Sequence, residues 1–130
     1  MRTLIAALIA TVSLTGCADR PAADDAAVHT AIAQHHAGAE VTFDGTVETM
    51  PQRAGDHEHL VVMTPQGDRL EVDHNVSLAP WVPARSGDQV IVHGQLYIDP
   101  GRAGVHCTHA HTSSGCPIPG WIELAGRYYE

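Results

Sequence analysis

The chain has 130 residues, a formal net charge of −8 with neutral histidines, and only arginine among its 7 basic residues. This length allows one modest domain with a single hydrophobic core. A protein that binds phosphate backbones needs clustered cations, and this chain has an excess of acidic residues and no lysine. It would bind such backbones poorly, so we expect no nucleic-acid partner. The same charge is repelled by anionic lipid, so attachment to a membrane would require a covalent lipid.

The N-terminal segment predicts export and lipidation. A short positive region, Met1-Arg2, precedes an apolar run over residues 4–14 that is too short to span a bilayer with margin. Leu14-Thr15-Gly16-Cys17 then resembles a bacterial lipobox, in which a peptidase cuts before the cysteine and the new N-terminal cysteine carries the lipid. We therefore expect residues 1–16 to be a lipoprotein signal peptide and Cys17 to be acylated. The alternative is an ordinary secretory signal with a cysteine nearby.

The mature chain would be held at the lipid bilayer by its acylated cysteine. Residues 17–27 are rich in Ala, Asp and Pro and are typical of a flexible tether, which leaves residues 28–130 as a single domain. Ala18, rather than an aspartate, follows the cysteine, and by resemblance to enteric lipoproteins this favours the outer membrane. The predicted location is thus a membrane surface that faces the periplasm or the cell exterior.

Hydrophobic periodicity predicts one helix followed by strands. Asp24 or Asp25 can cap a helix that Gly38 would stop. From Ala39 onward apolar and polar residues alternate with period two, which is typical of half-buried strands, whereas residues 50–58 form a polar loop. The expected elements are a helix over residues 26–36 and strands over residues 41–48, 59–64, 69–74, 89–98, 103–108, 121–124 and 127–129.

The order of these elements indicates an all-β fold. Three strands, an irregular connector over residues 75–85 and two more strands resemble the oligonucleotide/oligosaccharide-binding (OB) barrel, which is small, five-stranded and partly open. Residues 121–129 would add a C-terminal hairpin, and the short helix would precede the barrel. A generic β-sandwich is the alternative, but the chain has few strands for one.

Two cysteines remain once Cys17 is lipidated. Cys107 and Cys116 form an even pair in an oxidising compartment, which favours a disulfide that closes a short loop. The alternative is a redox-active or metal-ligating thiol pair, but the Cys-x-x-Cys spacing that would favour it is absent.

Ten histidines is a high count for a chain of this length. His57 would begin one strand of an antiparallel hairpin and His74 would end the next, so both could lie at one end of the barrel, next to Asn75 and Trp81. His74 is in phase with the core-facing positions of its strand. It is therefore either part of a polar ligand site or a hydrogen-bonded structural histidine.

A second histidine cluster has the residue types of a zinc or copper site. His106-x-x-His109-x-His111 precedes Cys116, and imidazole and thiolate are donors that these ions prefer. On a strand, however, His106 and His109 would point to opposite faces. The candidate metal ligands are His57, His74, His106 and His109, and the alternative is that the cluster hydrogen-bonds to shape a loop.

Several motifs in fixed order are similar to a known family. Gly45, Val47, His57, Gly87-Asp88 and Gly94 accompany three more specific motifs, which are His74-Asn75-x-x-Leu78-Ala79-Pro80, His106-x-Thr108-His109 and Gly120-Trp121-Ile122. Over roughly residues 39–129 the chain resembles the bacterial domain of unknown function 3465 family. The resemblance implies a fold and a surface, and no activity.

The chain departs from that family around its two paired cysteines. The family usually carries tryptophan where this chain has Cys107, His-Asp-Pro where it has Ala110-His111-Thr112, and histidine near Cys116. The paired changes at 107 and 116 are those expected if a cross-link between two cysteines replaces the residues that the family has there.

The functional hypothesis is a binding protein. We find no Ser-His-Asp order, nucleophile elbow, P-loop or glycosidase carboxylate pair. We therefore expect an envelope-anchored, non-enzymatic module for an unidentified small ligand or envelope protein. The alternative is a histidine-based zinc- or copper-binding protein or a metal-dependent envelope enzyme. The candidate ligand-binding residues are His57, His74, Asn75, Trp81, His106, His109 and Trp121.

Overall fold

The computed structural model describes residues 19–130, so the predicted signal peptide and the lipidation site Cys17 lie outside the described residues. Within residues 19–130, no helix is long and apolar enough to cross a membrane. The elements are α1 (Asp25–Ala33), β1 (Glu40–Val47), β2 (Gln52–Ala54), β3 (His57–Met63), β4 (Arg69–Asn75), β5 (Gln89–Asp99), β6 (Arg102–His106), β7 (Trp121–Leu124) and β8 (Arg127–Tyr129).

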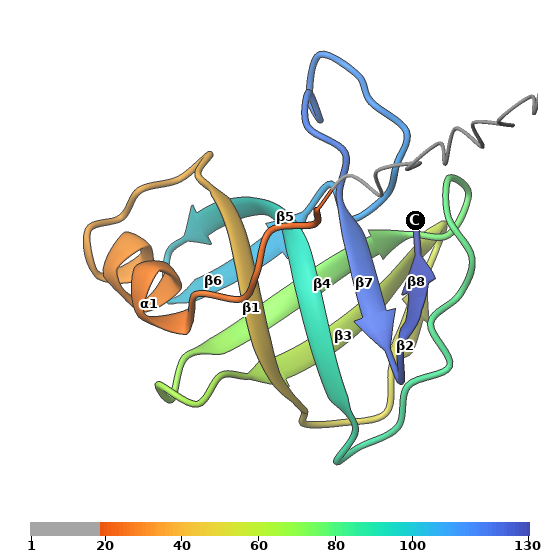
Figure 1. Ribbon diagram of the computed structural model, residues 1–130, viewed down its shortest axis with the longest axis horizontal. Coiled ribbons are helices and arrows are strands. Elements are labelled where there is room, and N and C mark those ends of the chain that lie inside the picture. The colour runs from red at the N-terminus through yellow and green to blue at the C-terminus, as the bar shows by residue number, and fades with distance from the viewer. Residues whose placement is uncertain (1–18) are drawn as a thin grey trace, which may run out of the picture.

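Five of these strands close into a barrel (Figure 1). β1 pairs with both β3 and β5, β3 pairs with β4, and β5 pairs with β6, all antiparallel. The parallel pair β4–β6 closes the ring. β7 and β8 extend the sheet from β5 as a hairpin. The predicted OB-like five-stranded barrel, its C-terminal hairpin and the short N-terminal helix are therefore confirmed.

Alternating side chains fill the barrel. Every second residue of β3 and β4 is buried, as the period of two predicts. Gly94 on β5 lets the strands approach closely, because a Cβ there would lie 2.4 Å from the carbonyl oxygen of His106. The inward-facing strand residues of the core are Val41, Phe43, Val47, Leu60, Val62, Leu70, Val72, Val90, Val92, Leu96, Ala103, Val105, Ile122 and Tyr129.

Most strand boundaries lie within two residues of the predictions, and the differences that have a structural reason are at β2, β6 and α1. β2 lies in the expected polar loop, where it pairs with the start of β3 through exposed residues that leave no apolar alternation to detect. β6 ends at His106, two residues early, because Cys107 adopts a left-handed backbone with φ of 57°. The helix ends at Ala33 rather than at residue 36, because His35 also adopts positive φ.

The start of the described chain lies against the barrel. The backbone N–H of Asp24 donates to the carbonyl oxygen of Thr42 on β1, and the Asp24 carboxylate caps α1 by accepting from the N–H of Ala27. Val28 on α1 is buried in the core. The helix thus begins within the range 17–27 for which a tether was expected.

Candidate functional site

His74 on β4 is fully buried, and both of its ring nitrogens are hydrogen-bonded. Nε2–H donates to the carbonyl oxygen of Pro80 over 3.0 Å, and Nδ1 accepts from the hydroxyl of Thr108 over 2.9 Å. Burial is the main cause that lowers the pKa of His74. The neutral ring therefore joins three segments of the chain at one end of the barrel.

Glu58 on β3 is the cross-strand partner of His74 and was not predicted as a site residue. Its side chain is fully buried, and one carboxylate oxygen accepts from the backbone N–H of Val82 over 2.8 Å. The other oxygen, Oε1, has no hydrogen-bond partner. Burial raises the pKa of Glu58 to about 7. The sequence signal for Glu58 was its position as a charged residue shortly before the apolar run of residues 60–63.

His57, His106 and His109 lie around the same end of the barrel but bind different partners. His57 is half-exposed, with Nδ1 3.0 Å from a carboxylate oxygen of Asp56. His106 is 3.0 Å from Gln95 through Nε2, and His109 donates from Nδ1 to the carbonyl oxygen of His111. They share this end because His57 pairs with Asn75, the residue after His74, and β6, which ends at His106, runs parallel to β4.

The predicted metal ligands do not form a coordination group in this structure. Across residues 19–130, no three His, Cys, Asp or Glu side chains are arranged so that they could hold an ion. His74 would have to give up a hydrogen bond to offer either nitrogen, which would leave a buried polar group without its partner. In this structure His74 thus shapes the barrel end, while His57, His106 and His109 are bound to separate partners.

Asn75 ends β4, and Trp81 lies in the connector between β4 and β5. The side-chain oxygen of Asn75 accepts from the backbone N–H and the hydroxyl of Ser77, which is the Asx-turn arrangement. Trp81 is 38% exposed, while Val82 next to it is buried in the core. Asn75 therefore directs the turn, and Trp81 is left at the surface.

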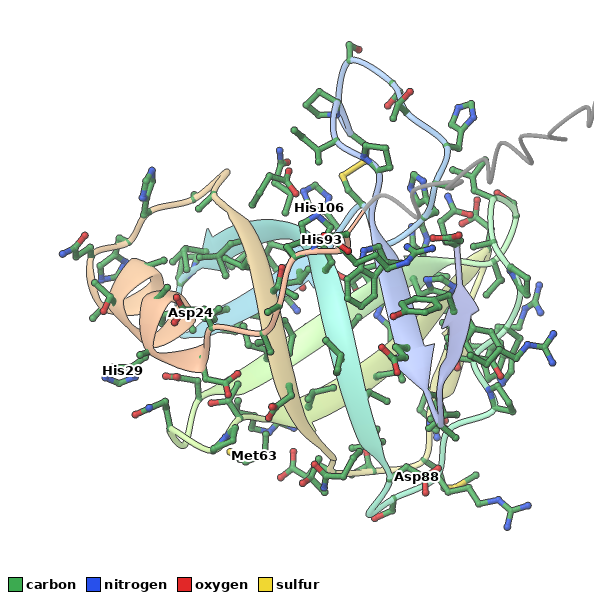
Figure 2. All side chains as sticks on the ribbon, viewed as in Figure 1. Asp24, His29, Met63, Asp88, His93 and His106 are labelled. Carbon is green, nitrogen blue, oxygen red and sulfur yellow. A yellow bond between two sulfur atoms is a disulfide. The ribbon has the colours of Figure 1, made fainter. Side chains whose placement is uncertain are left out.

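The predicted disulfide Cys107–Cys116 is confirmed. It closes the loop that leads from β6 towards β7, and Figure 2 shows the sulfur bridge at the base of this loop. Gly120, where the loop rejoins the sheet, admits no side chain because a Cβ would lie 1.9 Å from the carbonyl oxygen of Cys107. The loop is thus fixed at both ends beside Trp121.

Trp121 lies on the outer face of the β5–β7–β8 sheet. Its neighbour Ile122 points into the barrel, so Trp121 and Glu123 lie on the opposite face of β7. The Trp121 ring is only 4% exposed there, because Arg20, His93 and Tyr128 pack against it. Tyr128 on β8 and Glu130, which follows the strand, face outward, because Tyr129 between them is buried. Aromatic and acidic groups thus share one face of the C-terminal hairpin.

These outward side chains line an open groove with a volume of about 1030 Å³. The described N-terminal segment passes along it, next to the middle of β5, where Figure 2 labels His93. His93 stacks on Trp121 with ring centroids 5.7 Å apart, and Tyr128 meets Trp121 edge-on at 5.2 Å. The groove is lined by Asp19, Arg20, Pro21, His93, Ile118, Pro119, Trp121, Tyr128 and Glu130.

Thr42 holds the His93 ring in place. The Thr42 hydroxyl is 2.8 Å from Nδ1 of His93, and the two residues are cross-strand partners on β1 and β5. Burial is the main cause that lowers the pKa of His93, and the positive charge of Arg20 lowers it further. A neutral, oriented imidazole therefore supports one face of the Trp121 indole.

The comparison with family models decides the assignment of the chain. A family model described as Protein of unknown function (DUF3465) matches residues 10–130. The chain belongs to the DUF3465 family. No curated protein matches it.

Two of the motifs that carried the resemblance meet in this DUF3465 structure. His74 and Pro80 come from the first motif and Thr108 from the second, and the hydrogen bonds of His74 join all three. The third motif follows directly, since the N–H of Gly120 donates to the carbonyl oxygen of His109. In this DUF3465 protein the three motifs therefore build the barrel end and position Trp121.

Sequence analysis found Trp121 but missed the rest of the groove in this DUF3465 chain. Arg20, His93, Tyr128 and Glu130 come from distant segments, and only the fold brings them together. The signal within β7 was that Trp121 and Glu123 occupy the face of the strand opposite to Ile122, which fills the barrel core.

Proposed function

We propose that this DUF3465 protein is an exported lipoprotein, attached to a bilayer through acylated Cys17, whose barrel is a non-enzymatic binding module. The outer membrane, facing the periplasm or the cell surface, is the location that Ala18 favours. The observation that carries the binding function is the open groove beside the outward-facing Trp121 and Tyr128. Aromatic walls with a few polar groups are typical of ligand and partner sites.

The arrangement of polar groups at the barrel end supports binding rather than catalysis. Both ring nitrogens of His74 form structural hydrogen bonds, and the buried Glu58 carboxylate accepts a hydrogen bond from Val82. A general acid or base must reach the proton it transfers. The groove, by contrast, is open and is lined by aromatic and charged groups.

A ligand screen by thermal shift tests the binding function. We expect at least one compound class to raise the Tm of the wild-type protein by mass action. Tyr128→Ala removes an outward-facing groove wall and should abolish this shift. Trp81→Ala is the matched control, because it removes an exposed aromatic side chain outside the groove and should leave the shift intact. Shifts that persist in Tyr128→Ala would reject the groove as the site.

Fractionation and mass spectrometry test the anchor. The wild-type chain should be recovered in membranes with a mature N-terminus at acylated Cys17. Cys17→Ser should release the protein from membranes or leave it unprocessed. A mature N-terminus at another residue, without acyl chains, would contradict the proposal.

A further inference from the structure

An arginine side chain already occupies the groove. The Arg20 guanidinium carbon lies 3.9 Å from the Tyr128 ring centroid and 5.4 Å from the Trp121 ring centroid. Its two terminal nitrogens donate to the two carboxylate oxygens of Glu130 over 2.7 and 3.0 Å. We call Trp121, Tyr128 and Glu130 the arginine cage.

The arginine cage matches a guanidinium group in three ways. The Tyr128 face and the Trp121 ring provide cation–π contact, and the Glu130 carboxylate provides a planar, bidentate partner. Glu123, the cross-strand partner of Tyr128, adds negative charge to the same outer face. A lysine ammonium could not form the paired hydrogen bonds, since the fork geometry belongs to arginine.

The cage is built by the barrel rather than by the arginine. Its three members lie on β7 or at the end of β8, and His93 and Thr42 support the Trp121 ring from β5 and β1. Arg20 comes from outside this sheet and precedes α1. The two aromatic members are therefore positioned by the barrel, whereas the Glu130 carboxylate, just beyond β8, is oriented by its hydrogen bonds to Arg20.

Arg20 is held in a way that permits exchange. The side chains of Arg20 and Glu130 are each 35% exposed, and solvent-exposed ion pairs contribute little net stability. The next hydrogen bond between this segment and the barrel is the one from Asp24 to Thr42, so only a short stretch of backbone must move away. An occupant linked this closely competes as an intramolecular ligand of about millimolar effective concentration.

We propose that the arginine cage is a recognition site for the guanidinium group of an arginine on another envelope polypeptide, and that Arg20 occupies it in cis until the partner displaces it. The inference rests on the proposed binding function and specifies its ligand class. The acidic surface, with a formal net charge of −8, attracts a cationic segment at long range.

Calorimetric titration of the purified full chain tests this assignment. The probes are acetyl-Ala-Arg-Ala-amide, acetyl-arginine-amide, and the same tripeptide with lysine or with citrulline, which is uncharged. Arg20→Ala empties the cage and should bind the arginine tripeptide about tenfold more tightly than the wild type, because the cis competitor is gone. The lysine and citrulline tripeptides should bind at least about tenfold more weakly than the arginine tripeptide.

Two further variants make the test specific. Arg127→Ala is the matched control, because Arg127 lies on β8 beside the Tyr129 ring and outside the groove, and it should bind the tripeptide as the wild type does. Glu130→Gln in the Arg20→Ala background should lose most of the gained affinity. Circular dichroism of each variant checks that the exposed substitutions leave the fold intact.

The outcomes separate this inference from the proposed function. Tighter binding of the tripeptide than of acetyl-arginine-amide supports a polypeptide source, and equal binding supports guanidinium recognition with a small molecule as the source. Equal or absent binding of arginine probes to the wild type and Arg20→Ala overturns the inference. If Tyr128-dependent ligands then still emerge from the thermal-shift screen, the proposed function survives without it.

Discussion

At the scale of single residues, two buried titratable groups face each other across β3 and β4. Burial lowers the pKa of His74 and raises the pKa of Glu58 to about 7, so desolvation opposes charge on both groups. Each side chain anchors the connector between β4 and β5, His74 through Pro80 and Glu58 through Val82. The barrel end is therefore sensitive to pH.

The raised pKa of Glu58 predicts how the free energy of unfolding changes with pH. Its pKa rises from 4.5 towards 7 on folding, so the folded state binds the extra proton between these values, and the free energy of unfolding falls as pH rises through this window. Glu58→Gln stays neutral and should be more stable than the wild type at pH 8 by about 3 kcal/mol. The difference should vanish near pH 4.5.

Urea denaturation of both proteins at several pH values measures this difference. Burial lowers the pKa of three histidines, which are His74, His93 and His109. Their contribution to the free energy of unfolding therefore falls as pH falls, because acid protonates them in the unfolded chain. Both proteins contain these histidines, so their effect cancels in the comparison. A difference that is independent of pH would show that Glu58 keeps its charge on folding.

The Thr108 hydroxyl provides a second prediction at this scale. Thr108→Val keeps the shape of the side chain but leaves Nδ1 of the buried His74 without a donor. An unsatisfied buried acceptor costs about 1–3 kcal/mol, so the urea midpoint should fall accordingly. Thr112→Val, at an exposed position in the disulfide loop, should leave the midpoint unchanged. Equal midpoints for both variants would remove the structural role assigned to Thr108.

At the scale of elements, the sequence predicted the strands whose alternation is carried by apolar residues. β3, β4 and β5 bury every second side chain along most of their length, and their positions were predicted within two residues. β2 was missed because its pairing uses the backbone alone. The early end of β6 was missed because positive φ at Cys107 follows from the loop closure and leaves no trace in hydrophobic periodicity.

The candidate site was less predictable than the fold for a physical reason. Trp121 could be proposed from its own strand, whereas its contact with Arg20 joins residues about one hundred positions apart. The alternation of side chains along β7 and β8 determines which of them share a face of the sheet. The face on which the N-terminal segment docks, however, depends on the whole barrel. The histidine cluster shows the converse, because residues close in sequence proved to have separate partners.

The disulfide loop gives a prediction for an element. The bridge spans a sequence separation of 9, and closing a loop of this length should stabilise the domain by about 2–3 kcal/mol on the chain-entropy model. Replacing both Cys107 and Cys116 by alanine should therefore lower the Tm by roughly 8–20 °C for a domain of this size. Calorimetry measures the change, with Ser114→Ala at an exposed position of the same loop as control. An unchanged Tm would show that the loop is held without the bridge.

At the scale of the whole molecule, Arg20 links the groove to the proposed membrane anchor. Ala18 and Asp19 alone separate Arg20 from Cys17 in the sequence. At about 3.5 Å per residue, a docked Arg20 would hold the arginine cage within roughly 10 Å of the lipidated cysteine. With Arg20 released, the chain between Cys17 and the Asp24 contact could extend to roughly 25 Å. The occupant of the cage would thus set the height of the barrel above the bilayer.

Energy transfer in reconstituted vesicles measures this height. In a Trp81→Phe background Trp121 is the one remaining tryptophan, and dansyl-labelled headgroups act as acceptors. The lipidated protein with Arg20 intact should show stronger transfer than Arg20→Ala, because release of the segment lets the groove move away from the surface. Arg127→Ala, whose guanidinium lies beside Tyr129 and outside the groove, should match the protein with Arg20 intact. Equal transfer with and without Arg20 would show that the cage contact does not determine the distance between barrel and membrane.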